Sequence, residues 1–283
     1  MMIKKGSKLH NHQGEKQVLS PLLYWIKEQC GWIENFGEYL CFCFDIIKAS
    51  CHKRPSFKLC LRQLYDIGVA SLPVVIITGF FTGMVLAAQA VYQLSDKGLS
   101  SVTGLLVAKA MITELGPVLT AFMVTGRVGA AICAELGTMH VTEQIDALET
   151  MAISPKQYLV APRLIAGTVA MPLLTIFSMV TGILGGCLIA STFFHIPPSS
   201  YFDPMPMQIT LFDLLTGVIK SLIFGLLIMT IGCFKGMKAS GGAAGVGKAI
   251  TSSVVITYCS ILLTNFFLTL SLNIFYTQFQ KGL

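Results

Sequence analysis

Charged residues inside or beside long apolar segments are the part of this sequence with the clearest potential for chemistry. Six of them fall within residues 114–151: Glu114, Arg127, Glu135, Glu143, Asp146 and Glu149. A charge at the centre of a membrane costs about 2.5 to 3.5 kcal/mol on insertion scales, so a charged residue there usually marks a functional site. We therefore expect the function of this chain to depend on this stretch.

Lys220 is the counterpart of Glu114 in a later apolar segment. It lies about nine residues after the expected start of that segment at Leu211, so both side chains are predicted to be near mid-membrane. Opposite charges at similar depth favour an ion pair or a shared wet cavity. The alternative is that the long side chain of Lys220 extends to the membrane surface.

Gly116 and Pro117 come directly after this acid. Pro117 has no N–H to donate, and its ring crowds the carbonyl of Thr113, so the helix is expected to kink or open beside Glu114. A freed carbonyl next to a buried acid is what a polar cavity at membrane depth requires.

A short acidic helix is predicted from Val141 to Ala152. Its apolar positions share one helical stripe, its acidic residues fall off that stripe, and Ser154–Pro155 ends the pattern. This helix lies on the side of the membrane where Lys and Arg should dominate. The acidic cluster favours a docking surface for another protein, and a solvated loop helix is the alternative.

The composition places these residues in an integral membrane protein. The chain is 54% hydrophobic and 12% charged, with a mean hydropathy of +0.71. Each of its apolar runs has the length of about 20 residues that a membrane-crossing helix requires. The predicted fold is therefore all-α, with five transmembrane helices at about Gly68–Val91, Val102–Thr125, Leu164–Phe194, Leu211–Phe234 and Ile250–Phe275.

The distribution of charge predicts the orientation. Half of the 20 Lys and Arg residues precede Leu64, and the loop 195–210 has none. The positive-inside rule then places the N-terminus in the cytoplasm, and five spans place the C-terminus on the far side. The net charge of +6 favours attraction to anionic lipid headgroups over nucleic acid binding.

Three regions are expected along the chain. Residues 1–20 read as a disordered cytoplasmic tail without a secretory signal, and residues 21–63 as an amphipathic interfacial helix and linker. Residues 64–283 form the five-span domain, in which residues 128–156 are the segment expected to contact a partner. GxxxG pairs at Gly79/Gly83 and Gly182/Gly186 indicate close helix packing, within the chain or between two copies.

Other kinds of chemistry have little support in the sequence. The nine cysteines are scattered without a C-x-x-C pair, so neither a metal site nor a disulfide is expected. The run Gly242 to Lys248 resembles a Walker A loop but is followed by Ala249 in place of Ser or Thr, so we expect a flexible turn there. No catalytic motif is recognisable, and an intramembrane lipid enzyme has nothing positive in its favour.

The run ELGPVLTAFMVTGRVGAAICAELGTMHVTEQIDALETMAISP from Glu114 to Pro155 resembles the MlaE (YrbE) family of ABC-transporter permeases. These are membrane subunits of Mce-associated lipid transport systems. The resemblance covers about Arg62 to Phe275, and the stretch from Gly241 to Val255 is similar to the family's loop before its last helix. Pro21–Ser50 is similar to the family's interfacial elbow helix.

The resemblance implies a homodimeric permease in the bacterial inner membrane. It implies a separate cytoplasmic ABC ATPase on each copy, which would bind the ATP and Mg²⁺, and an MlaD-like protein with an Mce domain on the periplasmic side. This chain would then need no cofactor and catalyse no reaction itself. A lipid, expected to be a glycerophospholipid, would occupy a cavity between the two copies.

The resemblance also implies roles for particular residues. The family's lipid-site positions map onto Glu114 and Lys220, with Thr113 where relatives can carry Arg. Gly116, Pro117 and Arg127 would be structural. The ATPase would contact a coupling segment from Glu135 to Met151, in which the expected contact residues are Glu135, Thr142, Glu143, Asp146 and Glu149.

The leading hypothesis is therefore the permease of an ATP-driven lipid transporter. The alternative is a self-contained, ion-coupled transporter in which Glu114 is a proton site. The acidic docking helix and the lack of a nucleotide site favour the first hypothesis, because a self-contained carrier would need no ATPase partner.

Overall fold

The computed structural model of this chain describes residues 37–46, 48, 57–95 and 102–281. The chain divides into two compact units, Met1–Lys48 and Ala49–Leu283. In the first unit, residues 37–46 are helical, in agreement with part of the predicted interfacial helix. The expected tail 1–20 and the rest of the predicted helix and linker lie outside the described residues.

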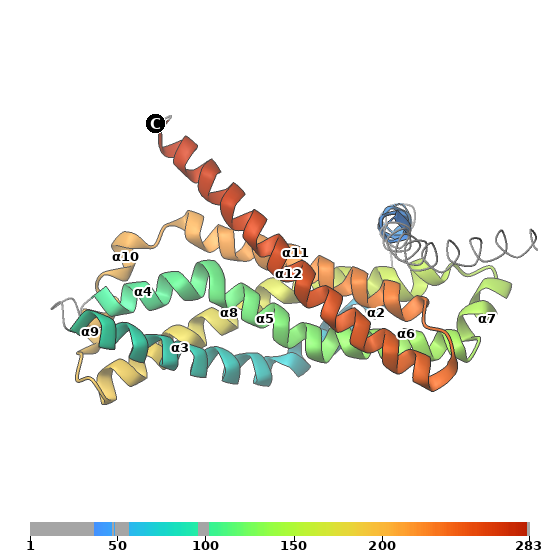
Figure 1. The fold of residues 1–283 in the computed structure, drawn as a ribbon, viewed down its shortest axis with the longest axis horizontal. Helices are drawn as coiled ribbons and strands as arrows, with labels where there is room; N and C mark the ends of the chain where they lie inside the picture. The colour runs from blue at the N-terminus through green and yellow to red at the C-terminus, as the bar shows by residue number, and fades with distance from the viewer. Residues whose placement is uncertain (1–36, 47, 49–56, 96–101, 282–283) are drawn as a thin grey trace, which may run out of the picture. The chain divides into compact units, whose positions relative to one another are not determined.

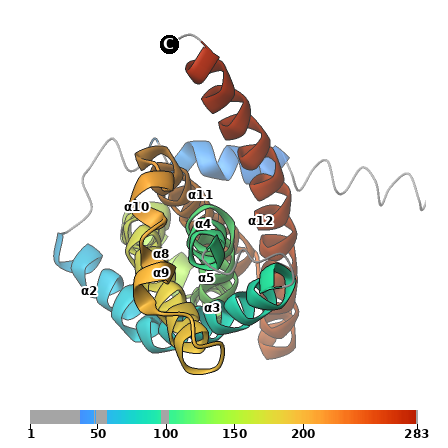
Figure 2. The same cartoon turned by 90° about the vertical axis from the view of Figure 1, so that its left-hand side faces the viewer.

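Helices are the only regular secondary structure among the described residues of the second unit (Figures 1 and 2). Its helices before residue 151 are α2 (Phe57–Gly68), η1 (Val69–Ser71), α3 (Leu72–Ser95), α4 (Thr103–Ala110), η3 (Met111–Leu115), α5 (Gly116–Val124), η4 (Thr125–Gly129), α6 (Ala130–Val141) and α7 (Gln144–Thr150). The later ones are η5 (Lys156–Val160), α8 (Ala161–Thr192), α9 (Pro198–Phe202), α10 (Met205–Gln208), α11 (Leu211–Met237) and α12 (Gly242–Lys281).

Five helical segments of the described residues are long and apolar enough to cross a membrane, as predicted. They are Phe57–Leu94, Thr103–Val141, Lys156–Thr192, Leu211–Met237 and Gly242–Gln278. Most are longer than the apolar runs in the sequence, because a helix can continue beyond the hydrocarbon core while only its middle part must be apolar. The chain is therefore a multi-pass membrane protein.

Close packing of α3 against α8 depends on the GxxxG glycines. A Cβ atom on Gly83 would lie 1.8 Å from the carbonyl oxygen of Gly182, and one on Gly79 would lie 2.8 Å from the carbonyl oxygen of Ser178. Any larger residue would force the two backbones apart. These glycines therefore serve packing within one chain.

The fourth and fifth spans differ in how much of them the rest of the chain covers. About half of the apolar window of α11 is buried (56%), against 17% for α12. Figure 1 shows that the C-terminal part of α12 diverges from the other helices. In this single chain α12 thus leaves a large apolar surface for lipid or for another polypeptide.

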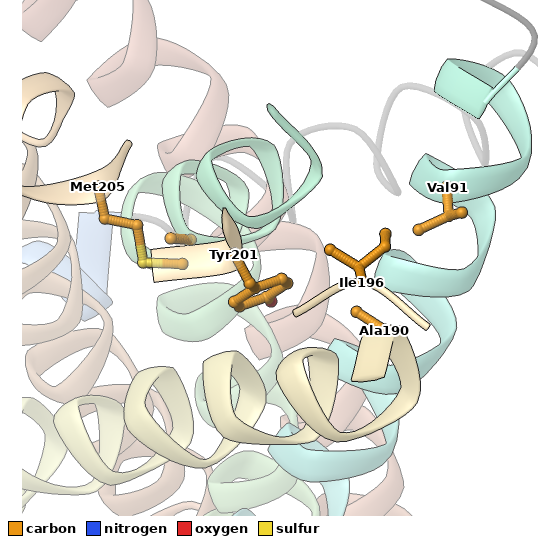
Figure 3. Packing of buried hydrophobic residues seen from close by; sticks show 6 residues of the cluster. Val91, Ala190, Ile196, Tyr201 and Met205 are labelled. Carbon is orange, nitrogen blue, oxygen red and sulfur yellow. The ribbon is translucent and has the colours of Figure 1, made fainter. Parts of the chain in front are cut away.

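Two short helices between the third and fourth spans close one end of the bundle. Tyr201 of α9 is fully buried in a cluster that includes Val91, Ala190, Ile196 and Met205 (Figure 3). Its hydroxyl donates to the carbonyl oxygen of Ile183 at 3.4 Å, and burial raises the pKa of Tyr201 far above its ordinary value. The loop is therefore packed down as part of the fold.

The second span continues as a helix beyond its predicted apolar run to Val141 and includes Arg127. Two predictions about helix boundaries were wrong. The predicted helix 141–152 is shorter, because Glu143 adopts a left-handed conformation (φ 59°) and only Gln144–Thr150 is helical after it. The glycine-rich stretch is not a loop, because α12 starts at Gly242 after positive φ angles at Gly241 and Gly242.

Candidate functional site

The second span opens into a wide turn at the residue that the sequence marked first. Residues Met111–Leu115 form a π-helical turn, in which the N–H of Gly116 donates to the carbonyl oxygen of Met111. Pro117 follows and cannot donate to the carbonyl of Thr113 four residues earlier. Glu114 therefore sits where the helix is widened and one backbone carbonyl lacks its usual helical partner, as the prediction of an opened helix required.

Lys220 of α11 fills this opening. Its Nζ atom donates to Glu114 Oε1 at 2.7 Å, to the carbonyl oxygen of Thr113 at 3.0 Å and to Thr269 Oγ1 at 2.8 Å. The side chain is 0% exposed. An ammonium group has three N–H donors, so every donor of Lys220 is used within this network.

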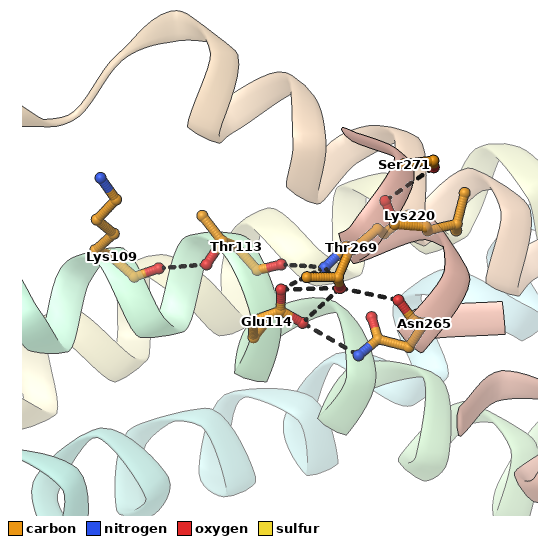
Figure 4. A network of polar contacts seen from close by, with 8 residues as sticks. Lys109, Thr113, Glu114, Lys220, Asn265, Thr269 and Ser271 are labelled. Atoms are coloured by element: carbon orange, nitrogen blue, oxygen red, sulfur yellow. Dashed lines mark hydrogen bonds and ion pairs between the residues drawn. The ribbon is translucent and has the colours of Figure 1, made fainter. Parts of the chain in front are cut away.

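The alternative for Lys220, that it extends to the membrane surface, is contradicted by this geometry. Lys109, two residues before the wide turn, differs from Lys220, since its side chain is 54% exposed and points away from Glu114 (Figure 4). Its Nζ lies 4.0 Å from Asp213 Oδ2. Glu114 and Lys220 thus pair directly within one chain.

Two residues of α12 that the sequence analysis did not single out complete the network. Asn265 donates from Nδ2 to Glu114 Oε2 at 3.1 Å, and Thr269 Oγ1 lies 3.1 Å from Oε1 of the same carboxylate. Both are uncharged, so a search for intramembrane charge passes over them. Their spacing of four residues, which places them on one face of a helix, was the available signal.

The Glu114 carboxylate is the part of the network that is open to the surroundings. Its side chain is 36% exposed, whereas Lys220 behind it is fully buried. Thr113 is half-buried, with its hydroxyl bonded to the carbonyl oxygen of Lys109 at 3.0 Å. The arrangement can therefore present a carboxylate and a threonine side chain to a ligand while a cation lies directly behind them.

Arg127 lies in a second wide turn of the same span, the π-helical residues Thr125–Gly129. Its Nη1 donates to Ser71 Oγ at 2.7 Å, and the Ser71 hydroxyl donates to the carbonyl oxygen of Ile67 at 2.6 Å. Arg127 therefore links the second span to the start of the first, which fits the structural role expected for it.

The acidic residues that follow are separate from this network. Glu135 Oε1 lies 2.7 Å from Nη2 of Arg163, whose side chain is only 4% exposed. The remaining predicted contact residues are exposed on or beside α7: Thr142, Glu143, Asp146 and Glu149. The structure thus divides the predicted site residues into a mid-span group and a group at one end of the bundle.

No cluster of three or more His, Cys, Asp or Glu side chains suited to a metal ion occurs among the described residues. The mid-span network consists of one cation (Lys220), one carboxylate (Glu114), one hydroxyl (Thr269), one side-chain amide (Asn265) and the backbone carbonyl of Thr113. Such a set can bind a polar or charged group by hydrogen bonds and exchange it without forming or breaking a covalent bond.

Comparisons with known proteins agree with this arrangement. The family model described as Permease MlaE matches residues 60–271. A probable ABC transporter permease protein of Rickettsia typhi is 38% identical over 243 residues, which cover 86% of this chain and 94% of the relative.

Two further relatives have more specific names. The intermembrane phospholipid transport system permease protein MlaE of Haemophilus influenzae is 36% identical over 217 residues, 76% of this chain and 83% of the relative. The chloroplastic protein TRIGALACTOSYLDIACYLGLYCEROL 1 of Arabidopsis thaliana is 36% identical over 224 residues, 79% of this chain and 63% of the relative. The match extends through all five membrane-spanning segments, and the chain belongs to the MlaE permease family.

Proposed function

We propose that this chain is the permease subunit of an ATP-driven transporter that moves glycerophospholipids between the bacterial inner membrane and an Mce-type periplasmic partner. The observation that carries the proposal is the Glu114–Lys220 network, an ion pair between two membrane-spanning helices in which the lysine is fully buried and the carboxylate is partly open to the surroundings. Phospholipid transport is also the function in the name of the Haemophilus influenzae relative.

The network suggests how a phospholipid headgroup is held and released. All three donors of Lys220 are occupied, so a lipid phosphate gains one of them only if an existing bond opens. The bond to Thr269 Oγ1 is the simplest to exchange, because it goes to a neutral oxygen, whereas the bond to Glu114 joins opposite charges. We infer two alternative states of the network. In one, Lys220 keeps all three of its hydrogen bonds within the chain, and in the other it donates to a lipid phosphate in place of Thr269.

ATP would act by shifting the population of these two states. A ligand shifts such an equilibrium only by its difference in affinity for the two states. A cytoplasmic ABC ATPase docked on the exposed acidic residues Glu143, Asp146 and Glu149 would supply that difference. A second copy of this chain, packed on the poorly covered face of α12, would complete the lipid cavity.

The test is ATP-driven phospholipid transfer by the assembled complex in liposomes. Lys220→Met should reduce transfer about 100-fold, because it removes a buried cation with three hydrogen bonds. Lys109→Met makes the same change two residues before the wide turn, at a side chain outside the network, and it should retain transfer. Normal transfer by Lys220→Met would refute the site.

The alternative, a self-contained carrier with Glu114 as a proton site, is tested in the same liposomes. The chain reconstituted alone with a pH gradient should move no lipid, because Glu114 is held in an ion pair with Lys220. Transport by the chain alone, driven by the gradient and lost in Glu114→Gln, would favour the carrier.

A further inference from the structure

A second polar site lies far from the mid-span network, in a cavity between α2 and the end of the second span. The cavity has a volume of about 420 Å³. Five of its lining residues are polar or charged: Arg62, Gln63, Asp66, Arg127 and Glu135. This is an unusual concentration of charge for an apolar protein, and the transport proposal makes no use of it.

The helix that forms one wall of the cavity has a second, apolar face. The residues of this face recur at four-residue spacing and are 48% to 79% exposed: Phe57, Leu61 and Tyr65 of α2, and Val69 at the start of η1. Such a stripe suits the acyl region of a membrane. The cavity is therefore walled by a helix that faces lipid on one side and presents Arg62, Gln63 and Asp66 on the other.

The charges in the cavity are not equally available to a ligand. Glu135 is paired with Arg163 at 2.7 Å, and Arg127 donates to the neutral Ser71 hydroxyl. Within the described part of the chain, Arg62 and Asp66 have no hydrogen bond or ion pair. Two cations thus face one unpaired acid, which leaves a local excess of positive charge suited to a monoanion.

We propose that this cavity binds the phosphodiester headgroup of a glycerophospholipid from the adjacent leaflet, with Arg62 and Arg127 as the phosphate-binding residues. A guanidinium group offers paired donors that match phosphate oxygens. The acyl chains would lie along the apolar stripe of α2. Since Arg62 belongs to the chain's basic N-terminal region, the charge distribution predicts that this leaflet is the cytoplasmic one.

This site is independent of the proposed transport site. A lipid here contacts α2, η4 and α6, whereas the mid-span network consists of residues from η3, α11 and α12. Glu114→Gln should therefore leave a lipid in this cavity. That difference allows the two proposals to fail separately.

The test is native mass spectrometry of the full-length chain in detergent, titrated with dioleoyl phosphatidylglycerol. Arg62→Glu should weaken the tightest binding step about tenfold or more. It replaces a guanidinium that donates hydrogen bonds to the phosphate by a carboxylate, which has the same sign of charge as the phosphate. Lys58→Glu is the matched control, since it changes an exposed cation one turn earlier on the same helix outside the cavity. It should leave this step unchanged.

A second variant tests the cavity without changing charge. Ala131 is exposed and lines the cavity, so Ala131→Phe should fill part of it and weaken the same binding step. Dioleoylglycerol, which lacks the phosphodiester, should not bind at this step in the wild type. The proposal would be overturned if Lys58→Glu weakened phosphatidylglycerol binding as much as Arg62→Glu does. It would also be overturned if neither Arg62→Glu nor Ala131→Phe weakened it.

Inorganic phosphate distinguishes a lipid site from a site for a free anion. At millimolar concentration it should displace little phosphatidylglycerol, because it cannot use the apolar stripe. Efficient displacement would refute the assignment to a lipid. Loss of this binding step in Glu114→Gln would also refute it, because the lipid would then belong to the mid-span site.

Discussion

Two ion pairs tie the second span to its neighbours, and they have the same length but different surroundings. Glu114–Lys220 and Glu135–Arg163 both measure 2.7 Å, and each joins a buried cation to a more exposed acid. Every donor of Lys220 has a partner, whereas Nη1 of Arg163 is buried without one among the described residues. The acid of the first pair is also less exposed, 36% against 59%.

This difference suggests different roles. A buried lysine whose three donors are all used can bind a new ligand only by exchanging one partner for another, which suits a binding site. In the Glu135–Arg163 pair the cation has an unused donor and the acid is well solvated, so the pair can separate at a small cost in free energy. This suits a contact at which two helices move relative to each other. We therefore assign substrate contact to the first pair and mechanical linkage to the second.

Charge reversal should have the largest effect of any substitution. Glu114→Lys or Lys220→Glu would place two like charges together in a poorly solvated site, and each should abolish ATP-driven lipid transfer. The double reversal should restore part of the transfer, because the two groups touch. Transfer and bound lipid are measured in the assembled complex.

The outcomes of this experiment have separate meanings. Normal transfer by both single variants would end the assignment of the mid-span site. Defects without any rescue would keep the site, but they would rule out direct pairing of Glu114 with Lys220 as the feature on which transfer depends.

Loss of the ATPase is the next largest expected effect, and it should arise at the other end of the span. Truncating one partner of a buried interfacial charge pair typically costs about 2 to 5 kcal/mol. Glu143→Lys should therefore weaken ATPase binding about thirtyfold or more, as measured by copurification and titration.

The matched control is Asp203→Lys, which makes the same charge reversal beside α9, at the opposite end of the bundle from α7 (Figure 1). It should retain the ATPase. Normal occupancy in Glu143→Lys would remove this region from the coupling surface.

The two ion pairs should also differ in stability. Lys220→Met removes three hydrogen bonds and leaves a half-enclosed carboxylate, so we expect a loss of about 3 kcal/mol. Arg163→Met removes a buried donor that lacks a partner and leaves the solvated Glu135, so about 1 kcal/mol is expected. Thermal unfolding in one detergent compares them, and equal losses would contradict the distinction drawn here.

The smallest effect is expected from Pro117→Ala. It restores an N–H that competes with Lys220 for the carbonyl of Thr113, so lipid transfer should fall several-fold, equivalent to about 1 kcal/mol. Pro172→Ala, at a proline inside α8, is the control and should have no such effect. Equal transfer by the two variants would mean that the freed carbonyl does not matter.

Sequence alone predicted the features of this fold that depend on hydrophobicity and charge. Five spans followed from the apolar runs, and the depth of Glu114 and Lys220 anticipated their pairing. Asn265 and Thr269 were missed because the rotation of α12 about its axis depends on packing that no local pattern records. The left-handed residue Glu143 was missed for a similar reason, since it is not glycine and the helical pattern continues across it.

The two wide turns of the second span also affect how mutational data should be read. Each π-helical turn adds one residue relative to an α-helix, which rotates everything after it by about 100°. A single helical wheel drawn through Thr103–Val141 would therefore be out of phase by about 100° after Leu115 and by about 200° after Gly129. A scanning experiment needs three separate wheels to separate lipid-facing from protein-facing positions.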